Sequence, residues 1–272
     1  MKNSLKSLTS IAFDIIWVVA AILIQLFAPL LFALILRNWD APEHVIVHTS
    51  HIIGSVATGI FILIVGRKKA SIRQNTILGD SDYGPITIGC FGAFAWMFFV
   101  SGAVAIVSCF TQNELLTAGN VASGYAELDM AGKAVSLFSM AIAAPFIEEL
   151  IFRGMLLGAL KSVYNVHFAV IVSALCFGLI HETSVPTVAF ATGMGIILGY
   201  TLIVSGNLQN CIVVHMIYNA ATSFRAFQMS DVETDIDMAV DSSAIITAAI
   251  VMILMAVFVL SLVGRWYYKK LK

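Results

Sequence analysis

Charged residues are scarce in this chain of 272 residues: Asp, Glu, Lys and Arg together make up 11% of it, while 60% is hydrophobic. Soluble domains carry about 25% charged and about 45–50% apolar residues. A folded chain of this composition has too little polar surface to face water, whereas lipid tails accept an apolar exterior. The composition therefore excludes a soluble globular domain and a disordered chain, and it predicts a protein embedded in a lipid bilayer.

A basic excess and paired cysteines are also lacking. The formal net charge is -1, which provides no basic footprint for nucleic acid. The four cysteines lie inside apolar runs at wide spacing, so they are predicted to be small buried hydrophobic residues. We therefore expect neither a nucleic-acid partner nor a disulfide framework.

Long apolar runs recur along the whole chain. A transmembrane helix needs about 20 apolar residues, and eight segments approach that requirement. They are residues 11–36, 45–66, 86–110, 133–160, 166–182, 185–205, 209–224 and 243–264. The fifth and seventh are short, so we expect their ends to be half-buried. The predicted fold class is all-α, a polytopic transmembrane helix bundle of about eight spans.

The basic residues of the predicted loops indicate an orientation. With the N-terminus inside, the inner segments contain eleven Lys and Arg residues against three outside. Cytoplasmic loops carry the excess of Lys and Arg, so both termini are predicted to be cytoplasmic. Three parts follow: residues 1–132 with the first three spans, residues 133–224 with the polar-bearing spans, and residues 225–272 with an acidic loop and the last span.

Two carboxylates and a guanidinium lie inside the fourth span. An ionisable side chain within a span is costly, which makes each one a functional candidate. Glu149 and Arg153 are four residues apart, so they share a helix face and are predicted to form a buried ion pair. Glu148 is turned away by about 100° and has no such partner on its own helix. It is therefore the candidate general acid or base.

The fifth and seventh spans add two histidines and an amide. His181 ends its apolar run, and helical rise from the intervening turn predicts a depth similar to that of Glu148. His215 and Asn219 share a helix face, which suits them to stabilising an oxyanion. Helical rise also places His215 shallower than Glu148, so tilt, a re-entrant segment or different span boundaries must reconcile the two. Polar contact between packed helices is the alternative role for these residues.

Three motifs in order on these spans resemble those of the CPBP family, also called the Abi family, which includes the type II CAAX prenyl endopeptidases. The motifs are Glu148-Glu149-Leu150-Ile151-Phe152-Arg153, Phe177-Gly178-Leu179-Ile180-His181 and His215-Met216-Ile217-Tyr218-Asn219. The resemblance covers residues 133–222, so it implies that the second of the three parts is a catalytic core.

The resemblance implies an intramembrane peptidase. By that resemblance Glu148 would activate a water with help from His181, while His215 and Asn219 would stabilise the tetrahedral oxyanion. The other three motif residues would hold the catalytic side chains in place without contacting the substrate; they are Glu149, Arg153 and Phe177. The expected substrates are membrane-associated proteins or peptides, cleaved in a bacterial plasma membrane.

A metal is left open by the residues. Glu148, His181 and His215 would form the His2Glu donor set that catalytic zinc uses, and a metal-free glutamate mechanism would use the same side chains. The usual zincin signature is missing, because His181-Glu182 is followed by Thr183-Ser184-Val185. Zn2+ is therefore an alternative and not a firm expectation.

Two functions of other classes are also open. A non-proteolytic scaffold or bacteriocin-immunity protein would keep the polar cluster for packing, and Glu148→Gln would then unfold it. A proton-coupled transporter would use intramembrane Glu and His as a relay, and the same substitution would abolish proton-coupled flux. A peptidase would stay folded and lose activity.

Overall fold

The computed structural model describes residues 2–38, 42–68, 82–111, 128–181, 184–230 and 242–272. Every regular element within these ranges is a helix. The single helices are α1 (Lys2–Leu36), α2 (Glu43–Lys68), α4 (Tyr83–Phe110), α9 (Val166–Leu179), α10 (Val185–Ser205), α11 (Leu208–Ser230) and α12 (Ser242–Leu271). One longer helix changes register along its length and consists of α6 (Met130–Phe138), η2 (Ser139–Ala143), α7 (Ala144–Glu149), η3 (Leu150–Leu157) and α8 (Gly158–Lys161). The predicted all-α class is confirmed.

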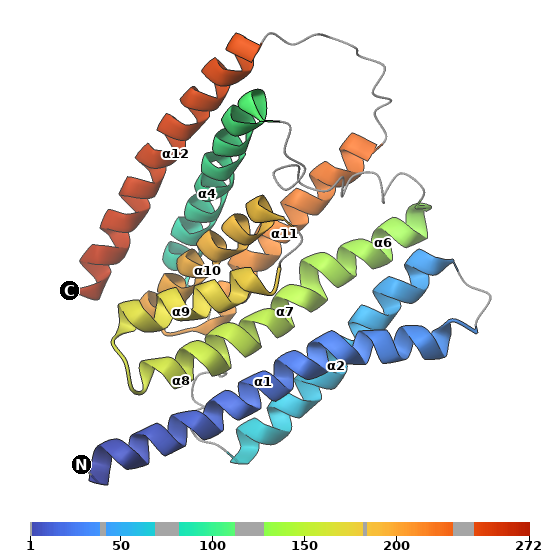
Figure 1. Cartoon of the computed structure of the whole chain (residues 1–272), viewed down its shortest axis with the longest axis vertical. Helices are drawn as coiled ribbons and strands as arrows, with labels where there is room; N and C mark the ends of the chain where they lie inside the picture. The colour runs from blue at the N-terminus through green and yellow to red at the C-terminus, as the bar shows by residue number, and fades with distance from the viewer. Residues whose placement is uncertain (1, 39–41, 69–81, 112–127, 182–183, 231–241) are drawn as a thin grey trace.

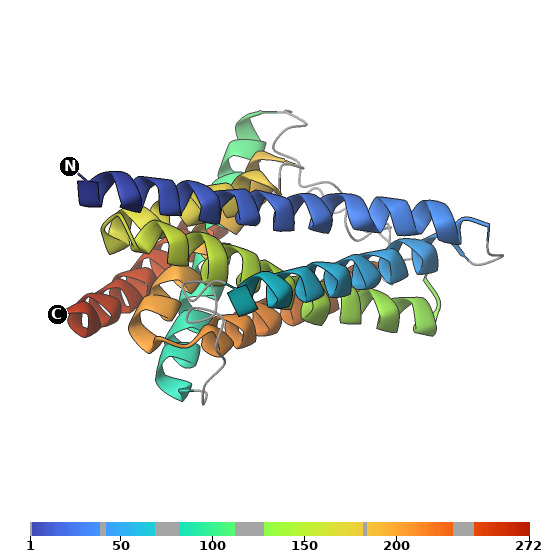
Figure 2. The ribbon, with the colours of Figure 1, turned by 90° about the horizontal axis from the view of Figure 1, so that it is seen from below.

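Six helices in the described part of the chain are long and apolar enough to cross a membrane. They are Ile11–Leu36, Val45–Val65, Tyr83–Phe110, Met130–Lys161, Val185–Ser205 and Ser242–Leu271. The predicted helical membrane bundle is confirmed, and the count of eight spans stays a prediction. The two ends of the chain lie at the same end of the bundle in Figure 1 and in Figure 2, as two cytoplasmic termini would require.

The fifth predicted span is shorter than expected. Helix α9 has 14 residues, or about 21 Å of rise, against a hydrocarbon core of about 30 Å. It ends at Leu179 and not at residue 182. Helix α10 starts soon afterwards, because the Ser184 hydroxyl accepts the Thr187 N–H and Pro186 occupies its first turn. His181 therefore lies in the connection after α9 and not on the helix itself.

The seventh predicted span, α11, begins inside the protein. Gly206 ends α10 in the left-handed region (φ 64°), and Asn207 and Leu208 after it are buried. This turn pairs its own polar groups: the Asn207 N–H donates to the Ser205 hydroxyl, and the Gln209 N–H donates to Asn207 Oδ1. Because α11 starts from a buried turn, His215 reaches the depth of Glu148, and the mismatch expected from helical rise is absent.

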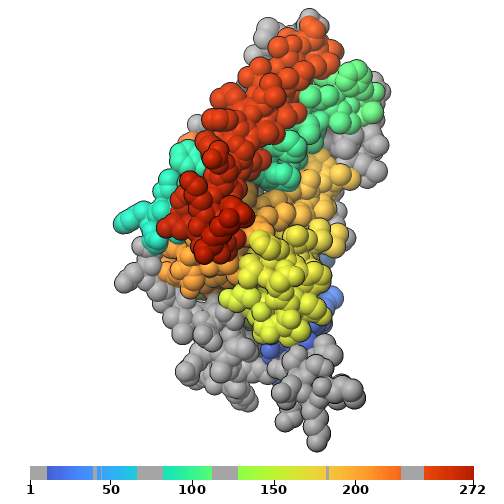
Figure 3. Space-filling view, turned by 90° about the vertical axis from the view of Figure 1, so that its left-hand side faces the viewer, coloured from blue at the N-terminus to red at the C-terminus, as the bar shows by residue number. Residues whose placement is uncertain are grey.

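The register-changing helix α6–α8 runs through the middle of the molecule (Figure 1). The α1–α2 hairpin packs on one side of it and the group α9, α10 and α11 on the other, while α4 and α12 pair at the far edge. Figure 3 shows α12 at the surface over α4, with α9 beside them. Residues 151–160 are all buried, so the core of the protein surrounds the helix that carries Glu148, Glu149 and Arg153.

Helix α10 is held from two sides at close range. A Cβ on Gly195 would lie 2.9 Å from Ala174 Cα of α9, so only a glycine allows this approach. From α4, the Trp96 indole N–H donates to Ala189 O at 3.0 Å. A Cβ on Gly193 would overlap that indole ring. Helix α10 therefore packs closely against α9 on one side and α4 on the other.

Candidate active site

The central helix changes register on both sides of the two glutamates. The π-helical segments η2 and η3 flank α7, the short α-helical stretch that ends with Glu149. In η2 the backbone N–H of Ala144 donates to Ser139 O, five residues back. π-Helical turns are rare, and they are frequent at functional sites. The backbone itself thus sets this stretch apart from the other spans.

Glu149 is the centre of a buried polar cluster. Its side chain is 0% exposed, and its Oε1 accepts from Arg153 Nη1 at 2.9 Å and from His215 Nδ1 at 2.9 Å. The ion pair expected between Glu149 and Arg153 is therefore present. A carboxylate paired with arginine only accepts hydrogen bonds, so Nδ1 of His215 is the donor. This contact fixes the imidazole ring and leaves Nε2 to face the other glutamate.

Glu148 approaches the same imidazole from the other side. Its Oε2 lies 3.8 Å from His215 Nε2, and its side chain is 17% exposed. Two heavy atoms at this separation are too far apart for a direct hydrogen bond and close enough for one water to bridge. The expectation that Glu148 lacks a partner holds only for its own helix, because α11 supplies one across the interface.

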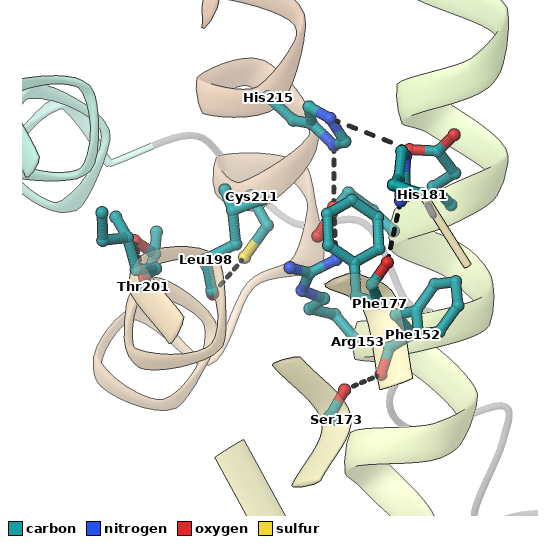
Figure 4. Close-up of polar contacts among 12 residues, drawn as sticks. Phe152, Arg153, Ser173, Phe177, His181, Leu198, Thr201, Cys211 and His215 are labelled. Atoms are coloured by element: carbon teal, nitrogen blue, oxygen red, sulfur yellow. Dashed lines mark hydrogen bonds and ion pairs between the residues drawn. The ribbon is translucent and has the colours of Figure 1, made fainter. Parts of the chain in front are cut away.

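Phe177 lies between the two histidines and the arginine (Figure 4). The Arg153 guanidinium carbon is 4.5 Å from the centroid of the Phe177 ring, a cation–π contact. The same ring contacts His215 edge-on, with centroids 5.8 Å apart, and His181, with centroids 4.7 Å apart. The Phe177 carbonyl also accepts from His181 Nδ1 at 2.8 Å. Both histidines therefore commit Nδ1 as a donor, which leaves each Nε2 for the space between them and Glu148.

A cavity of about 290 Å³ opens in front of these groups. Glu148, Phe177, His181, His215 and Asn219 all line it, so the structure brings together every residue that the sequence predicted to be catalytic. Glu149 and Arg153 lie behind this wall, buried and outside the cavity. Whether these side chains carry out the chemistry assigned to them stays a prediction.

The sequence did not identify the rest of the cavity wall. The additional lining includes Met140, Ala144, Thr187, Phe190, Met194 and Tyr218. Of these residues, Tyr218 is the one that the sequence could have indicated, because it lies inside the third motif, directly before Asn219. The backbone carbonyl of Met140 was also missed; it accepts from Asn219 Nδ2 at 2.9 Å. A carbonyl inside a helix carries no sequence signal of this role.

The residues do not form a metal centre in this arrangement. Within the ranges that the structure describes, no three His, Cys, Asp or Glu side chains come close enough together to hold one ion. The orientation of the two histidines would suit ligands, since each donates its Nδ1 hydrogen to an oxygen and turns Nε2 to the cavity. The spacing of the three predicted donors does not suit one ion, so these residues do not fit a zinc site in this arrangement.

A cavity lined by a carboxylate, two histidines and an amide thus lies inside an apolar helical bundle. Residues 130–221 match the family model of type II CAAX prenyl endopeptidase Rce1-like proteins. This match confirms the resemblance to the CPBP family, and it contains all seven predicted site residues. No curated protein and no solved structure is significantly similar to the chain. At the level of the family, the chain resembles multi-pass membrane endopeptidases.

Proposed function

We propose that the chain is an intramembrane endopeptidase that hydrolyses peptide bonds of membrane-associated proteins or peptides. One observation carries this proposal: Glu148, His181, His215 and Asn219, from three separate segments, line a single cavity inside an apolar bundle. Amide hydrolysis needs a base, a positioned water and donors for the oxyanion. The side chains around this cavity supply all of these functions.

Glu148 is the proposed base. Its carboxylate takes a proton from a water in the cavity, and the resulting hydroxide attacks the scissile carbonyl carbon. His181 holds the same water, because its Nδ1 hydrogen is committed to Phe177 O and its Nε2 can accept a water hydrogen. Glu148 then delivers the proton to the leaving amine as the carbon–nitrogen bond breaks. No atom is left over, since water adds one hydroxyl to the carbonyl and one hydrogen to the amine.

His215 and Asn219 are the proposed oxyanion donors. Asn219 contributes an amide N–H. His215, whose Nδ1 hydrogen is held by Glu149, contributes Nε2–H in its doubly protonated form, and this proton is separate from the one that Glu148 carries from the water to the leaving amine. Glu149 orients the His215 ring through the 2.9 Å contact at Nδ1. Arg153 in turn balances the charge of Glu149 at 2.9 Å, so the pair supports the site without touching the substrate.

The proposed substrate segment is short and unfolded. Binding pockets for small ligands occupy about 300–1,000 Å³, and this cavity of about 290 Å³ is at the lower limit. Such a volume suits a few extended residues and not a folded domain. We place the reaction in a bacterial plasma membrane, with both termini of the enzyme in the cytoplasm and the lipid bilayer as its surroundings.

The test compares protein N- and C-termini in native membranes that contain the wild-type chain or Glu148→Gln at matched abundance. Glu43→Gln is the matched control, because Glu43 is an exposed carboxylate at the start of α2 and away from the cavity. New termini should form with the wild type and with Glu43→Gln, and not with Glu148→Gln. These termini would also identify the substrate.

Other outcomes would favour the alternatives. If Glu148→Gln produces the same termini as the wild type, the assignment of Glu148 is wrong. If Glu148→Gln unfolds the protein, a packing role in a scaffold or immunity protein explains the cluster better. If no termini depend on Glu148 but proton flux in reconstituted vesicles does, the cavity belongs to a transporter.

A further inference from the structure

Tyr218 brings a hydroxyl to the cavity that the proposed reaction does not use. Among the residues that the structure describes, no group bonds to this hydroxyl; the bond from Thr222 goes to the Tyr218 backbone carbonyl. The hydroxyl is also not sealed inside the protein, in contrast to Ser50 Oγ and Glu149 Oε2, which are buried without a partner. A tyrosine hydroxyl inside a protein usually has a partner. This one is open to a molecule bound in the cavity.

Tyr218 and Asn219 lie on either side of His215 on the cavity face of α11. At about 100° per residue, Tyr218 is turned by about 60° to one side of His215, and Asn219 by about 40° to the other. Side chains on a helix lean toward its N-terminus, so the tyrosine ring extends back over the turn that carries His215. The imidazole is therefore flanked by a hydroxyl on one side and an amide on the other.

Helix α4 supports the Tyr218 ring from outside the cavity. The Phe94 ring lies against it, with centroids 5.7 Å apart and planes inclined by 44°. The two helices approach closely nearby, because a Cβ on Gly89 of α4 would lie 3.0 Å from the Val214 side chain of α11. A hydrogen-bond donor that is already held in place needs no reorganisation during the reaction. The packing of Tyr218 thus suits a catalytic donor.

We propose that Tyr218 is a further catalytic residue, whose hydroxyl donates a hydrogen bond to the oxyanion of the tetrahedral intermediate. It acts from the side of His215 that Asn219 does not occupy. The hydroxyl shares its hydrogen and keeps it, so the path of the proton through Glu148 is unchanged. This inference rests on the proposed function, because the oxyanion forms only when water attacks a peptide carbonyl in the cavity.

Tyr218→Phe tests the hydroxyl alone, because it keeps the ring and its contact with Phe94. We expect new termini in native membranes to form about 100-fold more slowly, with the free energy of unfolding unchanged. Tyr200→Phe is the matched control, since the Tyr200 hydroxyl bonds to His167 Nδ1 at 2.8 Å outside the cavity. This control should keep the wild-type rate. Full activity of Tyr218→Phe would overturn the proposal, and so would a loss of activity that accompanies a loss of stability.

A second readout separates stabilisation of the oxyanion from binding of the peptide. A synthetic peptide that spans the cleavage site found from the new termini is the probe. Loss of an interaction made only in the transition state lowers kcat and kcat/KM equally. Tyr218→Phe should therefore lower kcat and leave KM unchanged. A raised KM with unchanged kcat would assign the hydroxyl to the bound peptide and contradict its role toward the oxyanion.

Comparison with Glu148→Gln in the same membranes separates this inference from the proposed function. If Glu148→Gln is inactive and Tyr218→Phe is fully active, the proposed function stands and only the role of Tyr218 fails. If Glu148→Gln is as active as the wild type, the proposed function fails, and the role of Tyr218 fails with it.

Discussion

The two faces of the central helix differ in how completely their charges are paired. On the buried face, Glu149 and Arg153 are 0% and 1% exposed and bond to each other, and Glu149 also holds His215. On the cavity face, Glu148 is 17% exposed and its Oε2 lies 3.8 Å from Nε2 of the His215 imidazole. Adjacent residues therefore occupy opposite electrostatic situations, because a helix turns by about 100° per residue.

The two faces of the central helix therefore govern different properties of the protein. A fully paired and desolvated ion pair contributes to the fold, and removing one partner leaves a buried charge uncompensated. A carboxylate at a cavity wall can exchange a proton with water, and replacing it costs the fold little. Activity should depend on the cavity face and stability on the buried face, and each prediction below tests this division.

The largest expected effect is on the buried face. Arg153→Ala removes the partner of Glu149 and the cation over Phe177, so we expect the free energy of unfolding to fall by about 3–5 kcal/mol. Unfolding in mixed micelles, followed by circular dichroism during denaturant titration, measures it. Arg225→Ala is the control, because Arg225 is exposed on α11. A loss no larger than that of the control would show that the buried pair does not hold the fold together.

The next largest effect is on the cavity face. His181→Ala removes the proposed partner of the catalytic water, and we expect activity to fall by about 100-fold with stability unchanged. The rate at which the new termini form measures the activity. His167→Ala is the control, since this exposed histidine lies at the other end of α9 and bonds to Tyr200. Unfolding of the His181 variant, or full activity, would contradict the division between the faces.

A smaller effect is expected where the faces meet. Phe177 contacts Arg153 on one side and both histidines on the other. Phe177→Leu keeps most of the volume and loses the ring contacts, so stability should fall by about 1.5 kcal/mol or less, together with a partial loss of activity. Phe168→Leu, at an exposed position on the same helix, is the control. If only one of the two properties changes, Phe177 does not couple the faces.

The smallest effect is expected from metal removal. Because the predicted donors Glu148, His181 and His215 do not come together as a metal site, dialysis against a strong chelator should leave activity unchanged. The formation of termini before and after dialysis checks this, with the zinc content measured in the same sample. Loss of activity that added Zn2+ restores would show that the donors rearrange around an ion.

The sequence was sufficient for the fold class and for the composition of the site. Apolar runs predicted the helices, since a bilayer imposes a length and a composition that a single sequence displays. Ionisable residues inside the runs predicted the cavity residues, since burying them without a purpose is costly. The i,i+4 spacing predicted the Glu149–Arg153 pair, which the structure contains.

What the sequence could not supply depends on contacts between helices. The approach of His215 to Glu148 and Glu149 follows from the buried turn at Asn207, whose internal hydrogen bonds no periodicity displays. The end of α9 at Leu179 depends on where α10 begins. The Asn219 contact depends on a change of backbone register in η2, which is a property of the folded helix and not of its composition.

The Trp96 indole, which reaches from α4 to the carbonyl of Ala189 and covers Gly193, places one support of the cavity outside the segment that resembles the family. Helix α10 contributes Phe190 and Met194 to the cavity wall, so α4 helps to set how far that wall stands from Glu148. Exchanging residues 130–221 between two relatives would therefore transfer the proposed reactive groups but leave the width of the cavity to the recipient. Selectivity and chemistry could then diversify independently, each in its own part of one gene.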